Sequence, residues 1–322
     1  MNLVFFDIEC ASVFKTSAKI CAFGYVLCDE QFNIIEKEDI LVNPKGKFHL
    51  TDGRGEHGLV LPYEYSEFKN HPVFPQVYNR IKKLLEDKNN LVFGHATIND
   101  VNYLDLETRR FQLPPFDFDF SDSQLMYMTS IKDFSRQFGL EYITKDLDVE
   151  FTPHRAADDA YATMRVVEAL CKKHNCSPFD LEKLLGIRRG KLKGHRIYRP
   201  VSKAFTEYRN ELQRQKAERA DRRCKFYSKV NCRHKVTSHK LKGQAVCFSR
   251  LFEDDIQRSI PLVESIFACG GKYTQKIAEC TIYICDENDD SQRTKTVREG
   301  NSSGDGKIKI CTPEQLLQFM DK

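Results

Sequence analysis

The sequence predicts an α/β protein in which a larger domain comes first and a smaller α/β domain ends the chain. Three observations support this. Strand-like and helix-like stretches alternate over residues 1–172, a strongly charged stretch follows, and strand and helix patterns return from residue 242. A chain of 322 residues is long enough for two domains. We therefore expect domains at 1–172 and 242–322, joined by a basic helical linker at 173–241.

Three strands are predicted at the start of the chain. Residues 3–6 form a continuous apolar run, which is typical of a strand covered on both faces. The runs at 19–28 and 32–42 read as further strands joined by the turn-like residues 29–31. The chain therefore begins with a predicted β-meander.

Two acidic residues end the first predicted strand. Asp7 and Glu9 are two apart, so a strand that continues through them points both carboxylates to the same side. Like charges held that close repel each other unless a cation lies between them, and Mg²⁺ is commonly held by carboxylates. The pair is a candidate metal site. By itself it is weak evidence, because a strand more often ends in acidic residues simply because it has reached solvent.

Strand and helix patterns alternate in the next part of the chain. Residues 43–70 read as a loop, and an amphipathic helix follows with apolar positions at 77, 81, 84 and 85. A short strand at 91–93 precedes a helix with Asp100 in its first turn. Thr97 followed by Asp100 is close to a capping box, so Asp100 taken alone is interpreted as a helix cap.

A third group of polar residues precedes the helix that ends the first domain. Asp158 and Asp159 lie at its start, where acidic residues are common. His154 lies in the preceding loop, after Pro153, where no packing role is evident. Four carboxylates and a histidine thus fall at the ends of successive elements of a β/α arrangement, which is where sites collect in open sheets.

These residues resemble the motifs of the DEDDh family of 3′-to-5′ exonucleases, which includes the proofreading epsilon subunit of bacterial DNA polymerase III. The three family motifs are matched by residues 6–9 (FDIE), 94–100 (GHATIND) and 154–160 (HRAADDA). The resemblance covers about residues 1–172 and implies a ribonuclease-H-like mixed sheet. Asn99 and the pair Cys10-Ala11 depart from the usual family residues. Because those positions touch substrate in the family, the departures bear on substrate preference more than on activity.

The resemblance also implies the chemistry. Two divalent ions, Mg²⁺ or Mn²⁺, would be held by the four carboxylates, with Asp7 bridging the two ions. Glu9 and Asp159 would complete the shell of the ion that activates water, and Asp100 would hold the second ion. His154 would accept the proton from the attacking water, a task that suits its unperturbed pKa. The catalytic set is Asp7, Glu9, Asp100, His154 and Asp159.

The expected substrate is the 3′ end of a single-stranded nucleic acid, released as nucleoside 5′-monophosphates. DNA is the expected strand, with a role in replication proofreading or repair. Two alternatives stay open at this point. RNA could be the substrate, because recognition of a 2′-hydroxyl depends on the geometry of a pocket. The chain could also be a non-catalytic protein that binds strand ends and recruits a partner.

The predicted linker is the most basic part of the chain. Residues 199–242 hold 14 Lys and Arg against 4 Asp and Glu, a net +10, which leaves −6 for the rest of a chain whose total is +4. The segment is either a solvated helical spacer or an arm that contacts phosphates, with Phe226 and Tyr227 available to stack on bases. Cys224, Cys232, His234 and His239 are zinc-ligand types, but their spacing fits no standard zinc finger.

In the last predicted domain, strands at 245–248, 280–285 and 307–311 alternate with helices, and Gly270-Gly271 ends the first of these helices. This order resembles a BRCT domain, with Gly270-Gly271 as the most specific match. Thr312, Pro313 and Gln315 form a helix-start signature. The resemblance implies a protein partner and places Ser249 and Lys295 where phosphate-binding members hold their ligand. Arg250 stands where a glycine is usual, and the chain has no Trp on the last helix.

Composition excludes some classes of protein. No segment has the apolar length to span a bilayer, and the chain starts directly with a strand pattern, so we expect neither a membrane span nor a signal peptide. Many of the 12 cysteines lie inside apolar runs and read as reduced core residues. A cytoplasmic protein is the expectation.

Overall fold

The computed structural model describes residues 1–46, 65–150, 155–302 and 308–321. Within it the chain divides into two compact units, Met1–Arg209 and Asn210–Lys322. Helix α8 (Lys203–Val230) begins in the first unit and continues into the second. None of the described helices combines the length and the apolar content that crossing a membrane requires.

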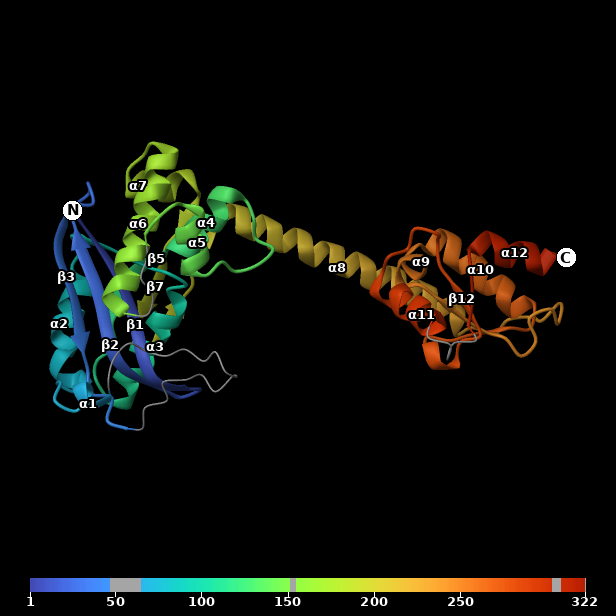
Figure 1. Ribbon diagram of the computed structural model, residues 1–322, viewed down its shortest axis with the longest axis horizontal. Helices are drawn as coiled ribbons and strands as arrows, with labels where there is room; N and C mark the ends of the chain where they lie inside the picture. Colours follow the sequence, from blue (N-terminus) through green and yellow to red (C-terminus); the bar gives the residue numbers. More distant parts are fainter. Residues whose placement is uncertain (47–64, 151–154, 303–307, 322) are drawn as a thin grey trace. The chain divides into compact units, whose positions relative to one another are not determined.

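The first unit is built on a seven-stranded mixed sheet (Figure 1). The predicted meander is confirmed, because β1 pairs antiparallel with β2 and β2 with β3. β4 and β5 then add in parallel beside β1, and β7 and β8 extend the far edge in antiparallel fashion. The strand order is β3 (Ile34–Leu41), β2 (Ser17–Cys28), β1 (Asn2–Phe14), β4 (Asn90–Gly94), β5 (Asp117–Asp122), β7 (Gly190–Lys193), β8 (Arg196–Tyr198).

Helices cover both faces of this sheet, and the alternation of side chains along β1 sorts its residues between them. Val4 and Phe6 join the core under α2 (Phe74–Glu86) and α3 (Ile98–Arg110). Leu3 and Phe5 join the core on the opposite face. Four helices supply that core: α4 (Ser123–Ile131), α5 (Leu140–Asp146), α6 (Ala156–His174) and α7 (Pro178–Leu184). A short helix, α1 (Tyr65–Phe68), contributes Phe68 to a separate small cluster, where it packs with small side chains of β1, β2 and α6.

The end of the first unit differs from the expected linker. The first compact unit ends at Arg209. The strands β7 and β8, which lie inside the expected linker at 173–241, belong to the main sheet of this unit. Leu192 is fully buried there, and Gly190 packs so tightly that a Cβ would lie 2.6 Å from the Phe120 ring. A second ribbon pairs β6 (Ile187–Arg188) with β9 (Val201–Ser202). The basic character of this stretch hid these short strands, because their charged side chains face solvent.

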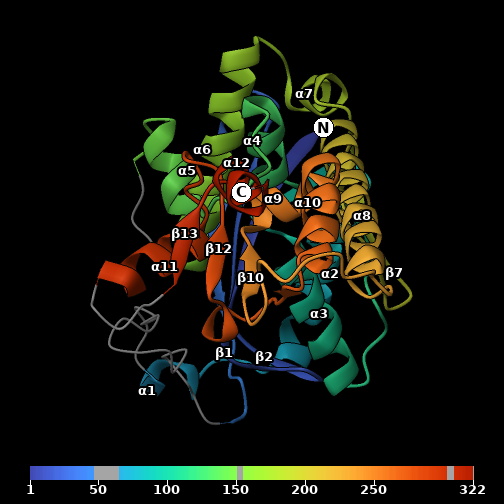
Figure 2. The same ribbon diagram turned by 90° about the vertical axis from the view of Figure 1, so that its right-hand side faces the viewer.

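The second unit holds a four-stranded parallel sheet in the order β11 (Lys272–Tyr273), β10 (Ala245–Phe248), β12 (Ile282–Ile284), β13 (Lys309–Cys311). Figure 2 shows β10, β12 and β13 next to one another. Between these strands lie α9 (Arg250–Asp254), α10 (Ile256–Ala268), η1 (Ile277–Glu279) and α11 (Gln292–Ser302), and α12 (Pro313–Asp321) follows. Gly270 ends α10 with a φ of 78°, a conformation that favours glycine.

Two sequence predictions about the second unit have opposite outcomes. The start of α12 is as predicted, since Gln315 N–H donates to Thr312 Oγ1 at 3.3 Å and Thr312 N–H donates to Gln315 Oε1 at 3.0 Å. Ser249 as an accessible phosphate ligand is wrong. Its side chain is fully buried, and its hydroxyl oxygen accepts the Phe252 N–H at the start of α9.

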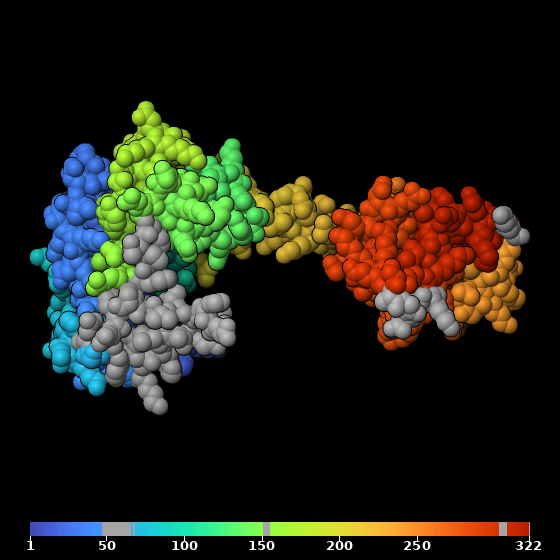
Figure 3. Space-filling view, viewed as in Figure 1, coloured from blue at the N-terminus to red at the C-terminus, as the bar shows by residue number. Residues whose placement is uncertain are grey.

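Helix α8 is largely exposed, as its middle turns in Figure 3 illustrate, and several of its charges pair within the helix. Arg214 contacts Glu211 at 2.9 Å, and Lys225 contacts Asp221 at 2.7 Å. The prediction that Phe226 is free to stack on bases is wrong. Phe226 is fully buried in the core of the second unit, while Tyr227 donates to Glu253 at 3.3 Å. A phosphate-binding role for the rest of α8 stays a prediction.

Candidate active site

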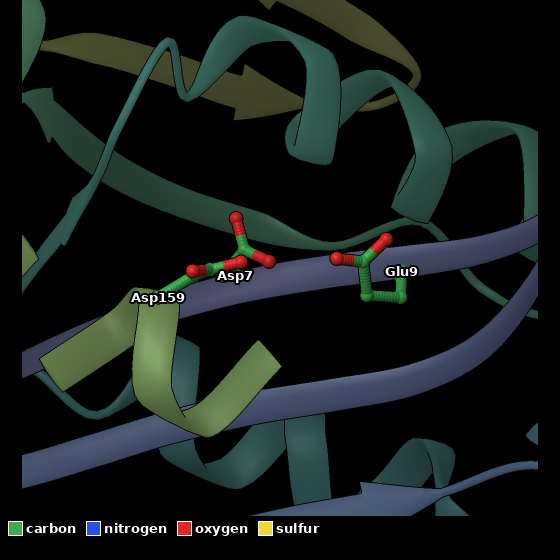
Figure 4. Close-up of side chains that lie close together, drawn as sticks. All are labelled: Asp7, Glu9 and Asp159. Carbon is green, nitrogen blue, oxygen red and sulfur yellow. The ribbon is translucent and has the colours of Figure 1, made fainter. Parts of the chain in front are cut away.

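Three of the predicted site residues come together at the start of α6. Asp7 and Glu9 project from the same face of β1, and Asp159 projects from the first turn of α6 (Figure 4). One carboxylate oxygen of each lies within 4.8 Å of the others. Residues that are 150 positions apart in sequence thus form one acidic cluster.

A row of three residues across the sheet positions this helix start. Asp7 on β1 is the register partner of Gly24 on β2, and Gly24 is the partner of Asp39 on β3. A Cβ on Gly24 would lie 2.0 Å from backbone atoms of Ala156 and Ala157. The first turn of α6 therefore rests directly on the backbone of β2, which is why Asp159 can reach Asp7.

Asp39 holds the same turn from its other side. Its Oδ1 accepts the backbone N–H of Ala157 at 3.1 Å, and its Oδ2 lies 3.7 Å from Arg155 Nε. A carboxylate at the positive end of a helix dipole is stabilising. Lys37, two residues earlier on β3, pairs with Asp158 at 2.7 Å. The edge strand β3 thus fixes how α6 begins.

Asp100 is buried near the cluster and is not part of a capping box. Thr97 has helical backbone angles and makes no cap hydrogen bond; its hydroxyl donates instead to the Ser121 carbonyl at 3.0 Å. The capping interpretation is therefore wrong. Asp100 is 5% exposed, and its charge raises the pKa of Asp7. The structure thus brings the fourth predicted carboxylate to the same region.

Asp122 organises the turn that leads into Asp100. Its carboxylate accepts the backbone N–H groups of Ala96 and Thr97, both at 3.2 Å, and of Gln124 at 2.9 Å. It also accepts Leu125 N–H at 3.3 Å, so one side chain joins the start of α4 to the turn before α3. Burial raises the pKa of Asp122 to about 6.

His95 fixes the same turn from the other side. Its Nε2 lies 3.2 Å from the Phe138 carbonyl, and its Nδ1 lies 3.0 Å from the Ser123 hydroxyl. Because a carbonyl can only accept, Nε2 carries the hydrogen and Nδ1 accepts from serine. Burial lowers the pKa of His95 to about 4, so the ring is neutral at physiological pH.

Burial and mutual repulsion raise the pKa values of the acidic groups at this site. Burial, and then the charges of Asp100, Glu9, Asp159 and Asp39, raise the pKa of Asp7 well above its usual range. Burial, followed by Asp159 and Asp39, raises the pKa of Glu9 to about 8. Burial and the charge of Glu9 raise the pKa of Asp100. A divalent cation between these groups would favour their ionised forms.

The donor atoms suit a hard divalent cation such as Mg²⁺ or Mn²⁺, since all are carboxylate oxygens. This is the only cluster of potential metal ligands of its kind among the residues that the structure describes. The zinc hypothesis at residues 224–239 gains no such cluster there. Cys232 Sγ does lie 3.4 Å from His234 Nε2, but Cys232 is exposed, His234 is only half-buried, and Cys224 and His239 do not join them.

The predicted proton acceptor, His154, lies outside the described residues. Gly24, Asp39 and Asp122 are residues that the sequence reasoning missed. Gly24 had a usable signal, because a glycine between Phe23 and Tyr25 in a strand interior often marks a close backbone approach. Asp39 and Asp122 had none, since each looks like an ordinary acidic residue until the strands are paired.

A family model covers the part of the chain that carries Asp7, Glu9 and Asp159. The model of the RNase_T protein family, whose description is "Exonuclease", matches residues 4–167. Comparison with curated proteins gives no significant match. One similar solved structure concerns recognition of the histone mRNA stem-loop by a 3′-exonuclease. It has 15% identity and a TM-score of 0.49, and the match covers 63% of this chain and 71% of that one.

Two further solved structures have comparable similarity. The nuclease domain of 3′hExo, a DEDDh family member bound to rAMP, has 18% identity and a TM-score of 0.45; the match covers 54% of this chain and 92% of that one. Escherichia coli exonuclease I in complex with a dA16 oligonucleotide has 18% identity and a TM-score of 0.41. That match covers 57% of this chain and 42% of the other.

Proposed function

The chain belongs to the exonuclease family, and we propose that it is a metal-dependent 3′-to-5′ exonuclease that hydrolyses single-stranded DNA ends to nucleoside 5′-monophosphates. The observation that carries this proposal is the convergence of Asp7, Glu9 and Asp159, whose ligand oxygens lie within 4.8 Å of one another. Phosphodiester hydrolysis needs a nucleophilic water and a stabilised leaving oxygen. Bound divalent cations supply both.

In this proposal each residue has a distinct task. Asp7, Glu9 and Asp159 would hold one divalent ion, and Asp100 with Asp7 would hold a second. His154 would take the proton of the attacking water. Asp39 and Gly24 position Asp159 through the first turn of α6, and Asp122 positions Asp100 through the turn before α3.

We also propose a BRCT-like module in the second unit that binds a protein partner. Its support is the parallel sheet with the strand order β11-β10-β12-β13 and the glycine pair after α10. Together with the resemblance of the first unit's motifs to proofreading exonucleases, such a module would support a role in DNA replication or repair, which is part of the proposal. The sequence-predicted phosphate site is not part of the proposal, because Ser249 is buried.

Digestion of matched 5′-labelled DNA and RNA oligomers by the full chain tests the proposal. We expect a ladder that shortens from the 3′ end and release of nucleoside 5′-monophosphates, with Mg²⁺ or Mn²⁺ and not with EDTA. DNA should be degraded faster than RNA. Cleavage that persists in EDTA, or no cleavage of either strand with either metal, would overturn the proposed activity. Faster degradation of RNA than of DNA would make RNA the substrate and leave the proposed mechanism unchanged.

A further inference from the structure

A hollow of about 340 Å³ lies beside the turn that leads into Asp100. It is formed within the first unit, between the start of α3, the start of α4 and the segment before α8. Arg199 and Phe205, which line it, lie beyond the 4–167 region shared with the exonuclease family. Its polar and aromatic lining comes from Asn99, Asp122, Gln124, Gln137, Arg199 and Phe205.

The polar groups of this hollow are available to a ligand. Among the residues that the structure describes, the side chains of Asn99, Gln137 and Arg199 form no hydrogen bond or ion pair, and all three residues are exposed. Gln124, also in the lining, donates its amide to the Phe138 carbonyl at 2.8 Å. The cationic side chain of Arg199 therefore pairs with no anion of the described residues.

The one acidic side chain in the lining does not oppose an anionic ligand strongly. Asp122 is 7% exposed, and its two oxygens accept the four backbone N–H groups described above. Its role is to hold the wall together. The exposed charge of the hollow is therefore that of Arg199.

Phe205 gives the hollow an aromatic wall. It is half-buried on the first turn of α8, and its ring centroid lies 5.5 Å from that of Phe134. Phe134 holds the ring in place while Phe205 still lines the hollow. Aromatic rings held this way are platforms for nucleobases.

The hollow adjoins the acidic cluster. Asn99, in its wall, is the residue before Asp100. Asp122, also in the wall, accepts the backbone N–H groups of Ala96 and Thr97 in the turn that leads into Asp100. The helix that Asp100 helps to begin, α3, shares its core with β1, the strand that carries Asp7. A strand whose last phosphodiester lies at the carboxylates would have its neighbouring nucleotide within reach of the hollow.

We infer that this hollow binds the nucleotide next to the scissile one, with Arg199 on its phosphate, Phe205 stacked on its base, and the Asn99 and Gln137 amides on the base edge. The inference rests on the proposed function for its choice of ligand. It assigns substrate binding to a segment that follows the family region. The extension at 186–209 would then bind the strand as well as complete the sheet.

Fluorescence anisotropy of the full chain with 5′-labelled oligothymidylate and oligouridylate in EDTA tests this inference without requiring hydrolysis. Arg199→Gln and Phe205→Leu should each weaken binding about tenfold. Arg199→Gln should also reduce the salt slope by roughly 0.7, the value for one phosphate contact. Arg196→Gln is the matched control, because Arg196 is an exposed arginine of the same segment that does not line the hollow. It should bind like the unaltered chain.

An abasic nucleotide in the labelled strand separates stacking from a general loss of fold. Placed in turn at each of the last positions of the strand, it should weaken binding by the unaltered chain at one position, and Phe205→Leu should erase that difference. Equal affinity of Arg199→Gln and the unaltered chain, or equal losses in Arg196→Gln and Arg199→Gln, would overturn the inference. Strand binding through the hollow with no hydrolysis in Mg²⁺ or Mn²⁺ would count against the proposed function alone.

Discussion

Buried carboxylates are handled in opposite ways in the two units. Glu253 of the second unit is 1% exposed in its side chain, and the chain itself supplies its partners. Arg250 and Arg293 approach it at 2.5 and 3.3 Å, and Tyr273 donates to it at 2.5 Å. In the first unit, no described Lys or Arg forms an ion pair with Asp7, Glu9 or Asp100, and the pKa of each is raised.

The difference separates a structural acid from a binding site. A buried charge is tolerated when a partner compensates it, and removing that partner is costly. Glu253 has its cations within the fold and is complete. Asp7, Glu9 and Asp100 form no ion pair with a described Lys or Arg, and the proposed divalent cation would supply that partner. The two environments should therefore respond oppositely when the carboxylate is neutralised.

Asp7→Asn is the strongest way to break this comparison. The change keeps the shape of the side chain and removes the negative charge at the centre of the cluster, so hydrolysis should fall by more than about 10³-fold, the scale of losing a central electrostatic contribution. The fold should remain, because Asp7 forms no ion pair with a described residue that the change would leave unpaired. Steady-state cleavage of a labelled oligomer measures the loss.

Asp158→Asn is the control for that variant. Asp158 is next to Asp159 but pairs with Lys37, and its activity should stay within about twofold, as for an exposed ion pair. Robust metal-dependent cleavage by a well-folded Asp7→Asn protein would remove Asp7 from the site.

His154→Ala sharpens the same comparison by asking whether a proton acceptor accompanies the carboxylates. The proposed task predicts a fall in turnover of roughly 10² to 10⁴ and a flatter acid limb of the pH–rate profile. His174→Ala, at the far end of α6, serves as the control. An acid limb that is unchanged in His154→Ala would make His154 a structural residue.

Gly24→Ala tests whether the placement of α6 creates the cluster. The added methyl would lie 2.0 Å from the backbone of Ala156 and Ala157, so the first turn of α6 must move and take Asp159 with it. A shift of this kind should lower turnover by about 10²-fold. Gly139→Ala meets nothing within 4 Å and has a negative φ, so it should have little effect. Full activity of Gly24→Ala would show that the position of Asp159 does not matter for catalysis.

Glu253→Gln is the corresponding test in the second unit. It leaves Arg293, which is 12% exposed, without its anion, and should lower the stability of that unit by about 3 kcal/mol. Amide hydrogen exchange of β10 and β12 localises the effect. Glu264→Gln breaks an exposed pair with Lys229 and should cost less than about 1 kcal/mol. A second unit as stable in Glu253→Gln as in the unaltered chain would contradict the comparison.

Measured per pH unit, the pH dependence of stability is the smallest of these effects. The pKa of Glu9 is about 8 in the folded, metal-free chain against 4.5 for an ordinary glutamate, so the folded state binds the extra proton between these values. Stability should therefore fall as pH rises from 4.5 to 8, by at most about 1.4 kcal/mol per pH unit for one proton. Saturating Mn²⁺ or Glu9→Gln should flatten this fall. Thermal unfolding across pH checks it, and a rise over the same range would contradict it.

Much of the acidic site could be predicted because its residues carry local signals. Asp7 and Glu9 come at the end of an apolar run in a predicted strand, and Asp159 lies in the motif at 154–160, at the start of a predicted helix. The order of the strands and helices then brings the three residues together. Asp100 was found for the same reason, although its capping role was wrong. The Gly24 and Asp39 supports needed the register of β1, β2 and β3, which no local pattern states.

The parts of the fold that escaped prediction share a physical cause. Residues 117–122 (DFDFSD) place acids between the buried Phe118 and Phe120, and 190–198 is basic, so neither stretch looks like part of a central sheet. Phe226 lies near the end of a charged helix, and only the fold of the second unit shows that it is buried. A charged sequence conceals elements that touch the core along one narrow edge.

The central claim is that the acidic cluster binds divalent cations. Calorimetric titration of Mn²⁺ into the metal-free full chain tests this claim most directly. Saturable binding is expected for the unaltered chain and for Asp158→Asn, and its loss is expected for Asp7→Asn. Equal binding by Asp7→Asn and the unaltered chain, or no binding by the unaltered chain, would contradict the account.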